Sequence, residues 1–250
     1  MINGDITGII TVRTSSTRLP SKCLLPFGDE TIITHVVNRA KNYGIEPIMC
    51  TSTDSSDDVL ENIAKECNIR FFRGSLNNKL KRWLDCAKHF NLRTFHTIDA
   101  DDPFFDGHEV IESMRVLKEQ RCDMVAPTQS SSAGGATVGY SLTAKIIGRA
   151  LQNIPKDTDT EMMWYFLEKV PGIKILTLND NYPNTPQVRL TLDYEEDYWM
   201  LASLVNILGN NATRSQINTF FLKNPDFSKI NYFRNQEWKN AQIAKKNLNY

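Results

Sequence analysis

The first half of the chain alternates short apolar stretches with longer segments of helical periodicity. TGIITV (7–12) has the length of a buried strand, whereas residues 31–44 carry apolar side chains at helical spacing and end at Gly44. The expected strands lie at 7–12, 47–51, 69–72, 94–98 and 122–127, and the expected helices at 31–44, 55–67, 76–90 and 107–120. This repeated order predicts an α/β fold with a mostly parallel central sheet and helices on both of its faces.

The second half follows this pattern less regularly. Residues 128–139 form a Ser/Gly-rich loop, and a loop of that length is either mobile or functional. VRLTLD (188–193) is an expected strand, and a helix is expected from about Glu195 to Leu208. Because no internal repeat or sharp linker interrupts the chain, we expect a single domain over residues 1–225, followed by a polar C-terminal extension at 226–250. The end of that extension could be a docked helix, a dimer contact or a frayed tail.

Charge and cysteine content exclude several classes of protein. Twenty-nine basic residues balance twenty-nine acidic ones, which argues against a nucleic-acid partner or an anionic membrane partner. The five cysteines are odd in number, widely spread and without a C-x-x-C pair, so they indicate neither a disulfide framework nor a zinc site. The N-terminus lacks a basic region, and no apolar run approaches the roughly 20 residues of a membrane span. We therefore expect a reduced, cytoplasmic protein.

A basic loop follows the first expected strand. Ligands of an open parallel sheet bind beyond the carboxyl ends of its strands, which is where this loop begins. Arginine offers forked donors suited to phosphate oxygens, lysine a mobile point charge, and hydroxyls with backbone N–H groups further donors. The polar residues of the loop are Arg13, Ser15, Ser16, Thr17, Arg18 and Lys22. The loop predicts a site for a small anionic ligand; the alternative is an ordinary solvated loop before a helix.

Three carboxylates follow the fourth expected strand. Asp99, Asp101 and Asp102 lie within four residues, and they repel one another unless a cation or basic groups neutralise them. Mg²⁺ prefers such oxygen ligands and uses one or two protein carboxylates beside phosphate and water. Asp193, at the end of another expected strand, is the best second ligand. The alternative is a solvated acidic turn.

The basic loop RTSSTRLPSK (13–22) resembles the R-x-x-S-T-R-L-P-x-K signature of the CTP-dependent cytidylyltransferases. It is most similar to that of the 3-deoxy-manno-octulosonate cytidylyltransferases and the SpsF-type spore-coat-polysaccharide proteins. Further segments resemble the family in the same order, so that the resemblance covers about residues 6–200. These segments are CTSTD (50–54), FRGS (72–75), IDADDP (98–103) and RLTLDYEED (189–197).

The resemblance implies a Rossmann-like nucleotidyltransferase fold, similar to the glycosyltransferase-A fold, with a nucleotide-binding half at 1–127 and an acceptor-binding half at 128–225. The loop would wrap the triphosphate of CTP, and Mg²⁺ would be held by Asp101 and Asp193. The catalytic residues implied are Arg13, Lys22 and Asp101. The nucleotide contacts implied are Arg13, Ser15, Ser16, Arg18, Lys22, Asp54, Arg73, Ser75 and Arg82.

Some of these residues have structural alternatives, and some positions depart from the family. Asp54 could instead be a helix N-cap, Arg73 an ion-pair partner, and Arg82 a solvated helical arginine. Asp99 stands where the octulosonate enzymes commonly have glutamine, so its role is open. Tyr194 and the following glutamate replace the usual Thr-Pro.

We expect CMP transfer from CTP to an anionic small-molecule acceptor with release of pyrophosphate. Residues 134–141 and 159–166 are expected to line the acceptor pocket, with Tyr140, Glu161 and Arg189 as acceptor contacts, since arginine suits a carboxylate, phosphate or phosphonate. A 2-keto-3-deoxy sugar acid is the first expectation, and a phosphonate or phosphorylated molecule the second. A nucleotide-sugar glycosyltransferase and a non-catalytic nucleotide sensor are the alternatives from other classes. A homodimer is possible.

Overall fold

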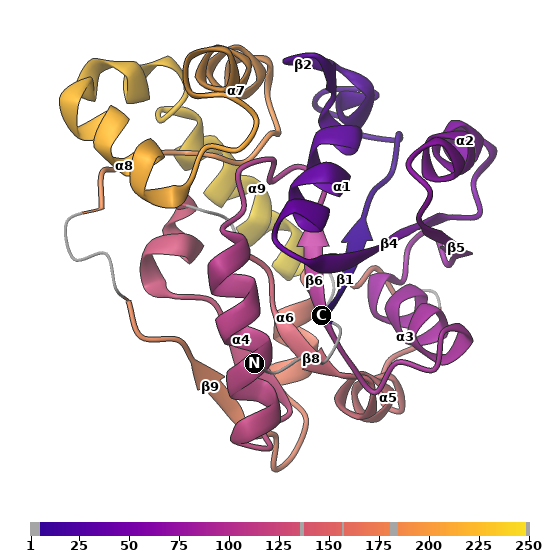
Figure 1. The fold of residues 1–250 in the computed structure, drawn as a ribbon. Helices are drawn as coiled ribbons and strands as arrows, with labels where there is room; N and C mark the ends of the chain where they lie inside the picture. Colours follow the sequence, from indigo (N-terminus) through magenta and orange to yellow (C-terminus); the bar gives the residue numbers. More distant parts are fainter. Residues whose placement is uncertain (1–5, 136–137, 157, 181–184, 249–250) are drawn as a thin grey trace.

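The computed structural model describes residues 6–135, 138–156, 158–180 and 185–248. A seven-stranded sheet in the order β5-β4-β1-β6-β8-β7-β9 forms the centre of these residues (Figure 1). The strands are β1 (Ile6–Thr11), β4 (Ile45–Ser52), β5 (Arg70–Gly74), β6 (Thr94–Asp99), β7 (Met124–Ala126), β8 (Ser141–Thr143) and β9 (Ile175–Thr177). A separate two-stranded ribbon joins β2 (Pro26–Phe27) to β3 (Glu30–Thr31).

The sheet is mostly parallel, which confirms the expected fold class. β1 pairs in parallel with both β4 and β6, and β4 pairs in parallel with β5. Only β8, inserted between β6 and β7, runs antiparallel to its described neighbours. Parallel strands end at the same edge of a sheet, so the loops after β1, β4, β5 and β6 come together there.

Helices cover both faces of the sheet. Their bounds are α1 (Ile32–Asn42), α2 (Asp58–Glu66), α3 (Lys79–His89), α4 (Gly107–Glu119), α5 (Ala144–Leu151) and α6 (Met163–Glu168). On β1, Ile10 packs into the core formed with α1, α2 and α4, whereas its neighbour Ile9 packs into the core formed with α3, α5 and α6. This alternation follows from the two-residue period of a strand. The four helices expected in the first half of the chain are all present.

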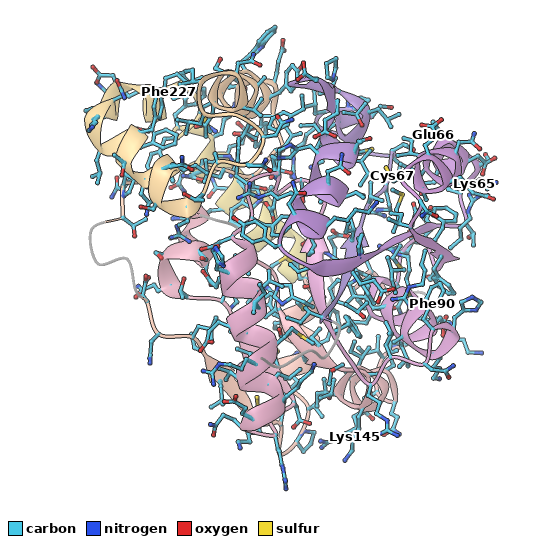
Figure 2. All side chains as sticks on the ribbon, in the orientation of Figure 1. Lys65, Glu66, Cys67, Phe90, Lys145 and Phe227 are labelled. Atoms are coloured by element: carbon cyan, nitrogen blue, oxygen red, sulfur yellow. The ribbon has the colours of Figure 1, made fainter. Side chains whose placement is uncertain are left out.

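A further helical layer, the C-terminal layer, is built from residues 195–248. It contains α7 (Glu195–Leu208), α8 (Arg214–Lys223), the 3₁₀ segment η4 (Pro225–Ile230) and α9 (Arg234–Leu248). Figure 2 labels Phe227 of η4 in this layer, where its ring packs against Phe220 and Phe221 of α8 with centroid distances of 5.0 and 5.9 Å. The expected helix 195–208 is confirmed to the residue.

The prediction of a strand over residues 188–193 is wrong. These residues are extended but join no sheet; instead Leu190 N donates to Gly134 O (3.1 Å) and Leu192 N to Asp101 O (2.7 Å). Leu190 and Leu192 are fully buried against α7. The alternation of apolar residues that predicted a strand therefore reflects burial of an extended segment against a helix. Gly134 has φ 101°, and a Cβ there would lie 2.9 Å from Val188 O, so the close approach requires glycine.

The Ser/Gly-rich loop is ordered over its described part. It contains a π-helical turn at Ser131–Gly135, whereas residues 136–137 lie outside the described residues. Glu109 of α4 accepts a hydrogen bond from Ser131 Oγ (2.5 Å), and Arg214 of α8 donates to the same hydroxyl (2.7 Å). The loop is therefore held between two layers of the fold.

The structure tests only some of the expectations about the cysteines, membrane spans, domains, location and oligomeric state. The five cysteines are free thiols, as expected. Within the described ranges, no helix combines the length and hydrophobicity needed to cross a bilayer. The domain boundaries, the cytoplasmic location and the homodimer stay predictions.

Candidate functional site

A cavity of about 440 Å³ opens at the carboxyl ends of β1 and β6. It combines the basic loop after β1, the carboxylates after β6, the start of α3 and the segment before α7. The predicted residues that line it are Arg13, Ser15, Ser16, Arg18, Lys22, Asp101, Glu161 and Asp193. Asp99, whose role the sequence left open, lines it too, together with Lys79. The structure thus brings together four cations and four carboxylates from distant parts of the chain.

The basic loop is held in place at its start by a buried carboxylate. Asp57 has no exposed surface and accepts hydrogen bonds from Thr14 N (2.8 Å), Thr14 Oγ1 (2.9 Å), Thr51 Oγ1 (2.8 Å) and Ser52 Oγ (2.5 Å). Burial alone would raise the pKa of Asp57, but these donors outweigh it and lower the pKa. Asp57 therefore stays ionised and ties the loop to the end of β4.

The loop then doubles back toward the sheet. Thr14 O accepts from both Ser16 N (2.9 Å) and Ser21 N (3.0 Å), and Ser21 adopts a left-handed conformation with φ 53°. Leu19 packs against the C-terminal layer. Lys22 then begins a 3₁₀ turn (Lys22–Leu24) and lines the cavity together with the residues of the loop.

Lys22 lies between the two predicted metal ligands. Its Nζ donates to Asp101 Oδ2 (2.9 Å), Asp193 Oδ1 (3.2 Å) and Leu192 O (2.5 Å). Burial alone would lower the pKa of Lys22, but Asp101 and Asp193 outweigh it and raise the pKa above its usual value. Both carboxylates therefore reach one cation, although 92 positions separate them in the sequence.

Asp193 is the more buried of the two carboxylates. Arg18 Nη2 donates to Asp193 Oδ1 (2.5 Å), and the Arg18 guanidinium lies 5.3 Å from the centre of the Tyr194 ring. Burial alone would raise the pKa of Asp193, but the positive charges of Lys22 and Arg18 outweigh it and lower the pKa to about 2. The carboxylate is thus available as a charged ligand throughout the neutral range.

A second group of charges lies on the other side of the cavity. Lys79 Nζ donates to Asp99 Oδ1 (2.8 Å) and lies 3.9 Å from Glu161 Oε1, while Arg13 Nη2 donates to Glu161 Oε2 (3.2 Å). Burial raises the pKa of Asp99. Burial would lower the pKa of Lys79, but Asp99 and Glu161 outweigh it and raise the pKa. The ammonium is therefore a permanent positive charge at the base of α3.

The donor set fits a divalent cation. Carboxylate oxygens of Asp99, Asp101 and Asp102 all lie within 4.8 Å of one another. Asp193 lies near them, because its Oδ1 accepts from the same Lys22 ammonium as Asp101 Oδ2. All of these are oxygen ligands, which Mg²⁺ prefers. The Lys22 ammonium demonstrates that a positive charge is accommodated between Asp101 and Asp193.

The lining residues offer no activated thiol. Cys23 lines the cavity, but burial raises its pKa to about 12. A thiolate nucleophile is therefore scarce at neutral pH.

Four predicted nucleotide contacts lie outside the cavity lining. Asp54 caps a 3₁₀ turn by accepting from Ser56 N (2.9 Å). Arg73 donates to Ser52 O (2.9 Å), Asp54 O (2.6 Å) and Asp58 (2.5 Å). Asp54 is thus an N-cap and Arg73 an ion-pair partner, which are the structural alternatives that the sequence offered for them. Their nucleotide contacts stay predictions.

Ser75 and Arg82 support the backbone next to the cavity. Ser75 Oγ accepts from Asn78 N (3.2 Å) before α3. Arg82 is buried, not solvated, and donates to Ser75 O (2.6 Å) and Leu76 O (3.1 Å). Since Arg13 donates to the same Leu76 O (3.1 Å), Arg82 lies behind the part of the chain that Arg13 contacts.

The structure buries Arg189 away from the cavity, against the acceptor contact expected of it, whereas the acceptor contact of Tyr140 stays a prediction. Arg189 is 2% exposed and lies behind Asp193, where its guanidinium is bound by carboxylates. Tyr140 is half-buried next to β6, where its backbone bonds with Thr97 and burial raises the pKa of its phenol to about 12. Neither side chain lines the cavity, whereas the third expected acceptor contact, Glu161, does.

Sequence reasoning missed Lys79 and Asp57. Lys79 is the first residue of α3, a position that the helix dipole makes unfavourable for a cation, and this misplaced charge was a usable signal. Asp57 lies in an acidic helix start of ordinary composition, so no local signal distinguished it from its neighbours.

Comparison with known sequences gives two results. The sequence model of a family described as cytidylyltransferase matches residues 7–141. The chain is similar to the spore coat polysaccharide biosynthesis protein SpsF of Bacillus subtilis, with 26% identity over 234 residues that cover 89% of this chain and 96% of the relative.

Comparison with solved structures agrees. A cytidylyltransferase from Leptospira borgpetersenii superposes with a TM-score of 0.78 at 25% identity, covering 90% of this chain and 96% of that one. A CMP:2-keto-3-deoxy-manno-octonic acid synthetase solved with CTP superposes with a TM-score of 0.63 at 14% identity, covering 82% and 99%. These likenesses confirm the expected Rossmann-like nucleotidyltransferase fold.

Proposed function

The chain belongs to the cytidylyltransferase family and is a nucleotidyltransferase, and we propose that it transfers CMP from CTP to a small anionic acceptor with release of pyrophosphate. The observation that carries this proposal is the Lys22 ammonium bound by both Asp101 and Asp193, with Arg18 on the same carboxylate. Such an array of cations and acids suits a polyanion with its counter-cation.

In the reaction proposed, an acceptor oxygen attacks the α-phosphorus of CTP. A new oxygen–phosphorus bond forms while the bond between the α-phosphorus and the oxygen bridging to the β-phosphate breaks, and pyrophosphate leaves with that electron pair. An acceptor hydroxyl passes its proton to solvent, whereas an ionised phosphonate or phosphate oxygen has no proton to lose. Arg13, Arg18 and Lys22 would bind the triphosphate and stabilise the charge of the departing pyrophosphate, so that positioning and electrostatics supply most of the rate.

Asp101 and Asp193 would hold Mg²⁺, which when bound neutralises phosphate charge. For this the Lys22 ammonium has to leave the two carboxylates, and its flexible stem allows it to move to the nearby phosphates. Lys22 would therefore have two sets of partners: Asp101 and Asp193 in the free protein, and the triphosphate when CTP is bound.

For the acceptor we propose first a 2-keto-3-deoxy sugar acid, and second a phosphonate or phosphorylated molecule. The similarity to a polysaccharide biosynthesis protein supports the first. With Arg189 buried behind Asp193 and Arg13 assigned to the triphosphate, Lys79 on the Glu161 side of the cavity is our candidate for holding the acid group.

A pyrophosphate-release screen tests the function. The protein with CTP and Mg²⁺ is assayed against sugar acids, phosphosugars and phosphonates, and the series is repeated with ATP, GTP and UTP. We expect pyrophosphate only when CTP and an acceptor are both present. Release of a nucleoside diphosphate from a sugar nucleotide would establish a glycosyltransferase instead, and CTP binding without turnover of any acceptor would establish a sensor.

A further inference from the structure

The C-terminal segment reaches the predicted metal ligand Asp193 through one buried side chain. Arg189 Nε and Nη2 donate to Asp197 (2.9 and 3.1 Å), and Nη2 also donates to Asp193 Oδ2 (3.0 Å). Its remaining nitrogen, Nη1, donates to Asn235 Oδ1 (3.2 Å) on α9. The guanidinium therefore joins the first turn of α9 directly to the carboxylate.

This contact decides which oxygen of Asp193 faces the cavity. Oδ2 is bound by Arg189, while Oδ1 is bound by the cavity cations Arg18 and Lys22. A carboxylate bound to a buried arginine through one oxygen cannot rotate freely, so it offers the other oxygen in a fixed direction. Side chains that orient a metal ligand in this way typically change metal affinity or activity when they are removed.

A second asparagine of the same segment holds the backbone. Asn231 is fully buried, and its Nδ2 donates to Arg189 O (2.8 Å) and Asp197 Oδ1 (2.9 Å). Asp197 in turn accepts from the backbone N–H groups of Asp193 (2.9 Å) and Tyr194 (3.0 Å). Asn231 thus closes a network around the turn that carries Asp193.

Further contacts fix α9 against the same turn. Arg234 donates to Glu196 through Nε (3.0 Å) and Nη2 (2.8 Å), and its guanidinium lies 4.8 Å from the centre of the Tyr194 ring. The Arg189 guanidinium lies 5.9 Å from the Trp238 ring. Figure 1 shows α9 running from the layer of α7 and α8 toward the middle of the molecule. The start of α9 is therefore a docked helix, one of the three possibilities that the sequence left open for this segment.

We propose that Asn231 and Asn235 are positioning residues of the cation site: they hold Arg189, and Arg189 orients Asp193. The inference rests on the proposed function for the identity of the cation site, but the network itself is independent of CTP chemistry. It assigns a role to the C-terminal segment and replaces the acceptor contact expected of Arg189.

Substitution of Asn235 tests the proposal, because this residue touches Arg189 but not the cavity. In Asn235→Ala, Arg189 loses one acceptor, and we expect binding of Mn²⁺ alone, followed by electron paramagnetic resonance, to weaken about tenfold. The Mg²⁺ concentration for half-maximal turnover should rise in parallel, with the KM for CTP little changed. Asn235→Asp keeps an acceptor oxygen and should bind Mn²⁺ within about twofold of wild type. Asn240→Ala, on the exposed part of the same helix, is the matched control and should do the same.

The outcomes separate this proposal from the function. Mn²⁺ binding at wild-type strength by folded Asn235→Ala, equal losses in the alanine and aspartate variants, or no Mn²⁺ binding by wild type would each overturn it. If Asn235→Ala does not fold, Asn235→Ser is measured in its place and judged by the same criteria. A wild type that binds Mn²⁺ but releases no pyrophosphate from CTP with any acceptor refutes the function and leaves the positioning role standing.

Discussion

Replacing Lys22 by methionine removes the positive charge that Asp101 and Asp193 share while keeping a side chain of similar length. The variant is informative because Lys22 has opposite effects on two measurable quantities. Its ammonium occupies the two carboxylates in the free protein and would bind the triphosphate during the reaction. Lys22→Met should therefore strengthen cation binding in the absence of nucleotide and weaken catalysis.

The magnitude follows from Asp193. A pKa of about 2 in place of 3.8 corresponds to roughly 2.5 kcal/mol in favour of the charged carboxylate. Lys22, Arg18 and Arg189 all lower the pKa of Asp193, and the charge of Lys22 has the largest single coulombic effect. Attributing about 1 kcal/mol of this to Lys22 predicts that Mn²⁺ alone binds about fivefold more tightly to Lys22→Met. Turnover with CTP should fall at least about tenfold, or roughly 1.4 kcal/mol in activation free energy.

Mn²⁺ titration followed by electron paramagnetic resonance and a continuous pyrophosphate assay measure the two effects. Lys81→Met is the matched control, because Lys81 is an exposed residue that pairs with Asp85 one helical turn away on α3. It should change neither quantity by more than about twofold. Weaker or unchanged Mn²⁺ binding by Lys22→Met would refute the competition between lysine and metal, and wild-type turnover would remove Lys22 from the reaction.

Two further predictions concern the loop and the core. In Asp57→Asn, an amide replaces the carboxylate that accepts from Thr14, Thr51 and Ser52, so we expect a loss of about 2–3 kcal/mol in unfolding free energy by chemical denaturation and a higher KM for CTP; unchanged stability would contradict the role given to this carboxylate. Burial lowers the pKa of His96 to about 3 from 6.5, so the unfolded state binds one more proton between these values. The stability that His96 contributes is therefore complete above pH 6.5 and decreases by about 1.4 kcal/mol per pH unit below it. In His96→Gln the dependence of unfolding free energy on pH from 4 to 6.5 should be shallower by that amount; an unchanged slope would show that His96 is protonated in the folded protein.

Local patterns were sufficient for the first half of the fold. A short apolar run predicts a strand such as β1, and apolar residues at helical spacing predict a helix such as α1. Both patterns are properties of residues that are close in the sequence. Right-handed, parallel connection of such units then leaves few topologies. The same reasoning predicted the loop at the end of β1 as the ligand site, and the cavity lies there. The antiparallel insertion of β8 had no such signal, because three residues are too few for a periodic pattern.

Contacts between distant segments could not be read in the same way. The sequence alone determined the chemical types at the site, a basic loop and an acidic strand end, because these depend on residue identity and on position within an element. Only the tertiary structure decided that Asp193 meets Asp101 at the ammonium of Lys22, that Lys79 joins the cavity, and that Arg189 faces the interior instead of a ligand. The physical reason is that the role of an arginine or a carboxylate depends on the partners that the fold brings within hydrogen-bond distance. In this site those partners lie up to 175 positions away along the chain.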